Sequence, residues 1–144
     1  MSPFNRILLC YDATPEGQLA LRAGAVLAQQ LQAETHLLSV FDTTHWSSGY
    51  DVLTAARADA DEDFARETLD EGIARLHSWG IDATGHHAAG SAIDEISRLA
   101  SQLRVDLIVI GHHPHSFFAR WLSGENHAML LDRVSCGVLF EVSR

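Results

Sequence analysis

Histidines of this sequence form two clusters that could carry chemistry. Three histidines, His112, His113 and His115, lie within four residues, and His86 and His87 are adjacent. Imidazole is a common ligand of zinc, copper and nickel. Neighbouring histidines at i and i+1 rarely point to one centre, however, and no paired cysteines accompany them. We therefore expect a polar, histidine-rich loop and no metal site.

Asp12 is a second candidate for chemistry, because it directly follows the apolar run from Ile7 to Tyr11. A carboxylate there can cap the turn into a helix, contact a ligand or act as a nucleophile. Thr14 stands where an Asp-x-Asp pair would need its second carboxylate, and the chain has no lysine. The common serine-hydrolase, zinc-protease and dinucleotide motifs are absent as well. The sequence predicts capping or ligand contact at Asp12, and no strong catalytic constellation.

The acidic balance of the chain limits its partners. Its 144 residues carry a formal net charge of −9, whereas nucleic-acid binding needs a concentrated basic face. Hydrophobic residues make up 47% and charged residues 20%, as in an ordinary globular domain. No charged segment followed by a long apolar run opens the chain. We expect one domain over residues 1–144, no signal peptide, no membrane span and a cytoplasmic location.

The pattern of apolar residues predicts strands that alternate with helices. Strands are predicted at residues 7–11, 35–41, 83–88, 105–110 and 137–142. Helices are predicted at residues 15–32, 50–79, 91–103 and 126–133. Alternation of this kind indicates an α/β fold, an open parallel sheet with helices on both faces. Ligands of such sheets bind at the carboxyl ends of the strands, near Asp12, Val40–Asp42 and the loop after Gly111.

Both ends of the chain resemble the universal stress protein family. The opening, from Asn5 to Val40, is similar to the family's first strand ending in Asp, its helix and its second strand. The segment from Val105 to Val142 is similar to the family's strand, glycine loop, helix, cysteine and final strand. The resemblance spans essentially the whole chain and implies five parallel strands in the order 3-2-1-4-5.

The glycine loop departs from the pattern of the family's nucleotide-binding members. That pattern is Gly, two residues, Gly, nine residues, then Gly followed by Ser or Thr. Gly111 and Gly124 fill the first and third positions, but Pro114 replaces the second glycine and Glu125 the hydroxyl residue. Pro114 removes an N–H donor, and Glu125 should repel an anion, so both changes weaken triphosphate binding. Replacement donors stand in or near the loop, namely His112, His113, His115, Arg120, Asn126 and His127.

The resemblance also implies which residues hold the nucleotide, which is ATP or AMP, with Mg²⁺ a candidate companion. Residues Cys10, Tyr11 and Asp12 would border the adenosine, and the backbone of Val40 would contact the adenine edge. The ribose and phosphates would lie along Gly111, His113 and the segment Gly124, Glu125 and Asn126.

Two further expectations concern the last strand and the cysteines. The family pairs two subunits through its last strand, here the apolar run Val138, Leu139, Phe140 and Val142, and an open edge of that kind independently favours a homodimer. In the family's strand order, one strand separates Cys10 from Cys136. Two strand spacings are roughly 9.5 Å, more than a disulfide allows, so we expect two unpaired thiols.

The sequence therefore favours a regulatory or binding module with an altered adenine-nucleotide site. The main alternative is a protein of the stress protein A branch, which the start Gly111-His112-His113 followed by Phe117-Phe118 resembles. That branch is associated with no ATP binding and would act through protein partners. A slow ATP hydrolase is a third hypothesis, and turnover is the less favoured outcome because no positioned water or charge clamp is evident.

Overall fold

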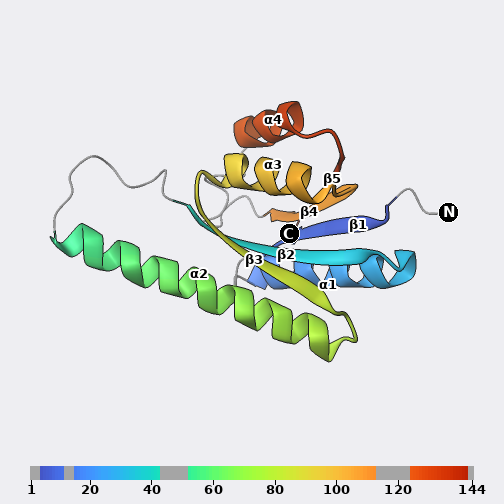
Figure 1. Cartoon of the computed structure of the whole chain (residues 1–144), viewed down its shortest axis with the longest axis horizontal. Coiled ribbons are helices and arrows are strands. Elements are labelled where there is room, and N and C mark those ends of the chain that lie inside the picture. Colours follow the sequence, from blue (N-terminus) through green and yellow to red (C-terminus); the bar gives the residue numbers. More distant parts are fainter. Residues whose placement is uncertain (1–3, 12–14, 43–51, 113–123, 143–144) are drawn as a thin grey trace.

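Five parallel strands form the centre of the molecule in a computed structural model that describes residues 4–11, 15–42, 52–112 and 124–142 (Figure 1). The strands are β1 (Arg6–Cys10), β2 (Glu34–Asp42), β3 (Ala83–Gly90), β4 (Leu107–His112) and β5 (Gly137–Val142). They pair in the order β3-β2-β1-β4-β5, and every pairing is parallel. The predicted fold class and strand order are confirmed.

Four helices in the described ranges cover the two faces of this sheet and make three layers. They are α1 (Pro15–Leu31), α2 (Val52–Ser78), α3 (Ala92–Leu103) and α4 (Gly124–Arg133). Helices α1 and α2 lie on one face, and α3 and α4 lie on the other (Figure 1). Within the described residues, none of these helices combines the length and the apolar character that a membrane crossing requires.

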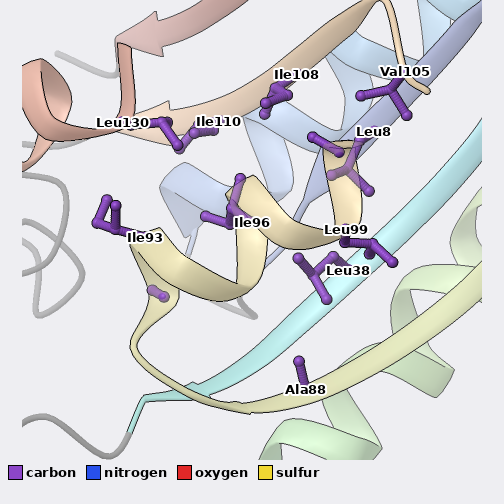
Figure 2. Packing of buried hydrophobic residues seen from close by; sticks show 12 residues of the cluster. Leu8, Leu38, Ala88, Ile93, Ile96, Leu99, Val105, Ile108, Ile110 and Leu130 are labelled. Carbon is purple, nitrogen blue, oxygen red and sulfur yellow. The ribbon is translucent and has the colours of Figure 1, made fainter. Parts of the chain in front are cut away.

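Each face of the sheet has its own apolar core, and β1 contributes to both. Leu8 faces the α3 side, where it packs with Leu38, Ile96 and Ile108 (Figure 2). Its neighbours Ile7 and Leu9 face the α1 and α2 side. All three β1 residues are at most 1% exposed, because successive side chains of a central strand enter opposite cores. The apolar run that predicted a strand buried on both faces is thereby explained.

Element boundaries mostly follow the sequence prediction, with one informative shift. The fourth strand begins at Leu107, two residues later than predicted. Val105 instead closes the end of α3, where its N–H donates to the Ala100 carbonyl. The carboxylate of Asp106 accepts hydrogen bonds from the N–H groups of Asn5 and Arg6. These two residues therefore form a turn that ties α3 to the start of β1, a role that an apolar pattern does not reveal.

A close approach of α1 to the sheet depends on Gly24. A Cβ atom at this position would lie 2.6 Å from the Cδ2 atom of Leu9, inside the core of that face. Glycine therefore sets how near the helix lies to β1 and β4, and with it how near the start of α1 lies to the carboxyl end of β1.

We predict that Gly24→Val destabilises the protein by about 1–3 kcal/mol, because the added carbons overpack a filled core. The matched control is Ala23→Val, one residue earlier on the same helix, where the side chain is only partly buried. Urea denaturation of both variants measures the effect. Equal midpoints for the two would contradict the role given to Gly24.

Candidate functional site

The strand order places a switch point between the carboxyl ends of β1 and β4, the position of the ligand crevice in doubly wound folds. The chain leaves β1 toward α1 on one face and leaves β4 toward α4 on the other. The two strands are neighbours, with Cys10 opposite Ile110, so the connections that follow them diverge at this point. Such a switch point is the usual ligand position in open α/β sheets. The fold and the sequence therefore both indicate the carboxyl edge of the sheet as the candidate site.

The main chain of Val40 faces β1 at this edge of the sheet. In a parallel ladder the N–H and C=O of one residue both face the same neighbouring strand. The Leu38 carbonyl accepts a hydrogen bond from the Tyr11 N–H, so the polar groups of Leu38 face β1. Two residues further on, those of Val40 face the same way, beyond Cys10–Leu38, the last register pair of β1 and β2. A flat heterocycle with a donor and an acceptor on one edge can pair with such a segment.

Cys10 contributes an uncharged wall to the same edge. It is partly buried and packs against the core of the α3 face. Burial raises the pKa of its thiol to about 12, so the thiol stays protonated at neutral pH. A protonated, partly buried thiol is a small apolar surface and neither a nucleophile nor a metal ligand.

The side chain of Tyr11 points away from the crevice, into the α2 side of the sheet. It is 3% exposed, and its hydroxyl donates to Glu71 Oε1 at 3.2 Å. Arg75 Nε donates to the same oxygen at 2.8 Å. Gly72 makes room for the ring, because a Cβ atom there would lie 2.8 Å from Tyr11 Cδ2. A ligand contact by Tyr11 would therefore come from its backbone, while its ring anchors the end of β1 beneath α2.

This anchoring role was absent from the sequence analysis. Glu71 lies 60 residues from Tyr11, and no local pattern pairs them. A second tether, from Ser39 Oγ to the Ala65 carbonyl at 2.9 Å, holds the end of β2 to the same helix and was likewise not predicted.

The glycine positions of the predicted site are divided between described and undescribed residues. Gly111 lies in β4, opposite Glu141. The backbones of Gly124, Glu125 and Asn126 form the first turn of α4, and α4 runs from the carboxyl edge of the sheet back toward the start of β5. A helix N-terminus presents free N–H groups that favour an anion. Asp12, His113 and Pro114 lie outside the described residues, so their roles remain predictions.

The histidines of β3 separate onto the two faces of the sheet. His86 Nε2 lies 3.0 Å from Nδ1 of His36 on β2. Burial, and to a lesser degree His36, lower the pKa of His86. His87 faces α2, where its Nε2 lies 3.7 Å from Glu62. Over the described part of the chain, no three His, Cys, Asp or Glu side chains converge as a metal-binding group.

Two other features lie away from the crevice. Cys10 and Cys136 are both free thiols, with β4 between their strands, as expected. A polar cavity of about 300 Å³ opens between the ends of α3 and α4, with Ser101, Arg104 and Arg133 among its lining residues. It adjoins the residues that precede β4 and β5, so it occupies the amino-terminal edge of the sheet, opposite the crevice.

The strand order and the two helix layers define a doubly wound α/β fold with a switch point between β1 and β4. Within that class the chain belongs to the universal stress protein family, whose sequence model matches residues 3–140.

Individual relatives agree with this assignment. A Staphylococcus haemolyticus protein named as a universal stress protein is 25% identical over 142 residues, which cover 96% of this chain and 85% of the relative. The universal stress protein UspA of Lactobacillus plantarum has a solved structure that superposes with a TM-score of 0.80 at 21% identity. That match covers 98% of this chain and 99% of the other. At this identity the structural likeness establishes the fold.

Two other similar structures hold adenine nucleotides. A universal stress protein in complex with cAMP matches with a TM-score of 0.70 at 20% identity, covering 96% of this chain and 97% of that one. A universal stress protein family member from Arabidopsis thaliana with AMP bound matches with a TM-score of 0.66 at 12% identity, covering 97% and 92%.

We predict that Cys10 resists thiol reagents in the folded protein. In a Cys136→Ser variant at pH 8, a pKa of about 12 makes the thiolate fraction of Cys10 about 10³-fold smaller than that of an ordinary cysteine. Reaction with Ellman's reagent should then require unfolding by urea. A Cys10→Ser variant, which retains Cys136, is the comparison. Labelling of folded Cys10 at the rate of a free thiol would contradict the inert wall assigned to it.

Proposed function

We propose that this protein is a binding and regulatory module that holds an adenine nucleotide at the carboxyl edge of its sheet, without rapid turnover. The observation that carries the proposal is the main chain of Val40, which faces β1 beyond the last register pair of β1 and β2, beside the β1–β4 switch point. Its polar groups suit the donor and acceptor edge of adenine, and the protonated Cys10 thiol supplies an apolar wall. The nucleotides held by similar structures support the same ligand class.

The phosphate end of the proposed site differs from the adenine end. The first turn of α4 offers N–H groups to a phosphate, but Glu125 adds a negative charge in that turn. Pro114 removes a further donor from the preceding loop. A monophosphate carries less charge than a triphosphate and needs fewer donors. We therefore propose AMP as the better ligand, with ATP binding dependent on Mg²⁺ to offset the charge of Glu125.

Isothermal titration with AMP and with Mg²⁺ATP tests this proposal. We expect one AMP per chain, with weaker binding of ATP when Mg²⁺ is left out. Gly124→Asp should abolish binding, because it adds a second carboxylate to the first turn of α4, whereas Gly124→Ala should be tolerated better. Circular dichroism checks that both variants remain folded.

A variant with the family's glycine-loop pattern restored distinguishes a weak nucleotide site from the absence of one. Pro114→Gly with Glu125→Ser restores the pattern of the nucleotide-binding members and should raise the ATP affinity at least tenfold, about 1.4 kcal/mol. If the natural chain binds no adenine nucleotide, the proposal is wrong, whether or not this variant binds one.

The second candidate function, favoured by Pro114 and Glu125 themselves, is a nucleotide-free protein that acts through protein partners. In that case the natural chain would bind no nucleotide, while the variant with the restored glycine-loop pattern would gain binding. Both candidates place the protein in the cytoplasm.

We further propose that the protein forms a homodimer through β5. This strand ends the sheet order, so one of its edges has no neighbouring strand among the described residues. Leu139 is 38% exposed on it, and Val138 and Phe140 are partly buried. An open apolar edge is a template for pairing with another strand.

The homodimer is tested by Leu139→Arg, which places two like charges at the shared edge and should produce monomers in analytical ultracentrifugation. Phe64→Arg is the matched control, since Phe64 is 60% exposed on α2, on the far side of the molecule from β5. Dimers that survive Leu139→Arg would exclude this edge, and monomers in the natural chain would exclude the dimer.

A further inference from the structure

Two imidazoles from neighbouring strands meet on the α3 face of the sheet. His36 on β2 and His86 on β3 are 50 residues apart in sequence, yet Nδ1 of the first lies 3.0 Å from Nε2 of the second. The register pairs His36 with Thr84 and His86 with Leu38, so the two rings are diagonal neighbours on one face. His36 stands four residues before Val40, roughly 13 Å along the strand from the nucleotide edge. The pair is therefore separate from the crevice.

The surroundings of His36 hold its ring in one orientation and one tautomer. Its side chain is only 9% exposed, and Glu34 Oε2 lies 3.4 Å from its Nε2. A carboxylate at that distance favours the proton on Nε2, which leaves a lone pair on Nδ1, the atom that faces His86. Arg6 Nε lies 2.7 Å from the same Glu34 oxygen and fixes the carboxylate in turn. Carboxylates that orient histidines in this way are the usual outer partners of metal ligands.

The two separations within the pair are close to those of two histidines on one tetrahedral ion, although the same separations also suit a hydrogen bond between the rings. With zinc–nitrogen bonds of 2.0–2.1 Å, two such nitrogens lie roughly 3.3 Å apart and their ring centres roughly 5.2 Å apart. Here the nitrogens are 3.0 Å apart and the ring centres 5.1 Å apart. His86 is the partly buried member, so a small rotation of its ring supplies the remaining separation.

We propose that His36 Nδ1 and His86 Nε2 bind one divalent transition-metal ion of the class that favours imidazole, with water completing the coordination. Zinc is the representative ion, and Mg²⁺ does not compete because it prefers oxygen ligands. In the metal-free pair, one of the two facing nitrogens carries the hydrogen between them. The favoured His36 tautomer places it on His86 Nε2, and metal binding moves it to His86 Nδ1 with no net release of protons. The bound ion links edge strand β3 to β2.

Titration calorimetry with zinc chloride tests the pair, after the four histidines of the C-terminal third of the sequence are removed. In a background that carries His112→Gln, His113→Gln, His115→Gln and His127→Gln, we expect one zinc per chain. Adding His86→Gln should lower the affinity at least tenfold, and adding Glu34→Gln should lower it about 10–100-fold, as for other outer partners. His77→Gln is the matched control, because that ring is 81% exposed at the end of α2 and should leave binding unchanged.

Imidazole NMR of the natural chain provides a second readout that no folding defect can imitate. Zinc should shift the ring signals of His36 and His86 together before those of His77 and His87. Full binding after His86→Gln, loss of all binding in the background variant, or shifts confined to other histidines would each overturn the proposal.

Discussion

Burial of β1 on both faces is the constraint from which the rest of the structure follows. Ile7, Leu8 and Leu9 carry almost no exposed surface, so the strand must lie at the centre of the sheet with a helix layer on each side. From β1 the sheet extends through β2 to β3 on one side and through β4 to β5 on the other. The point where the direction changes is the carboxyl end of β1, so this switch point is a consequence of the same apolar run that forms the core.

The sequence was most informative where its signals are local. Apolar runs and helical patterns predicted every described element. The helix predicted at residues 91–103 is α3, and the Ser91 side chain caps it by accepting a hydrogen bond from the Asp94 N–H. Prediction failed where a polar residue acts across the fold. Asp106 looks like part of a strand and instead forms a turn against Arg6. The strand order itself came from the family resemblance, because pairing between distant segments leaves no periodic trace.

The candidate site also has features that the sequence predicts and features that only the structure reveals. Its expected location follows from the fold, and Val40 is a candidate that the resemblance alone supplies. The buried ring of Tyr11 shows how a position can match a pattern while its side chain packs in the core. The pair His36 and His86 shows the converse. Adjacent histidines in the sequence drew attention to His87, whereas the partner of His86 comes from another strand. Metal and nucleotide would thus occupy two places on one sheet, with no residue shared between them.

The central claim is that an adenine edge pairs with the main chain at the carboxyl end of β2. Backbone amide NMR during addition of AMP tests it most directly, because it reports on Val40 and Gly111 without altering either residue. The account predicts that these two amides shift together and saturate, while amides at the amino-terminal edge, such as that of Asp106, do not move. Saturable AMP binding that shifts Asp106 and its neighbours and leaves Val40 unchanged would contradict it.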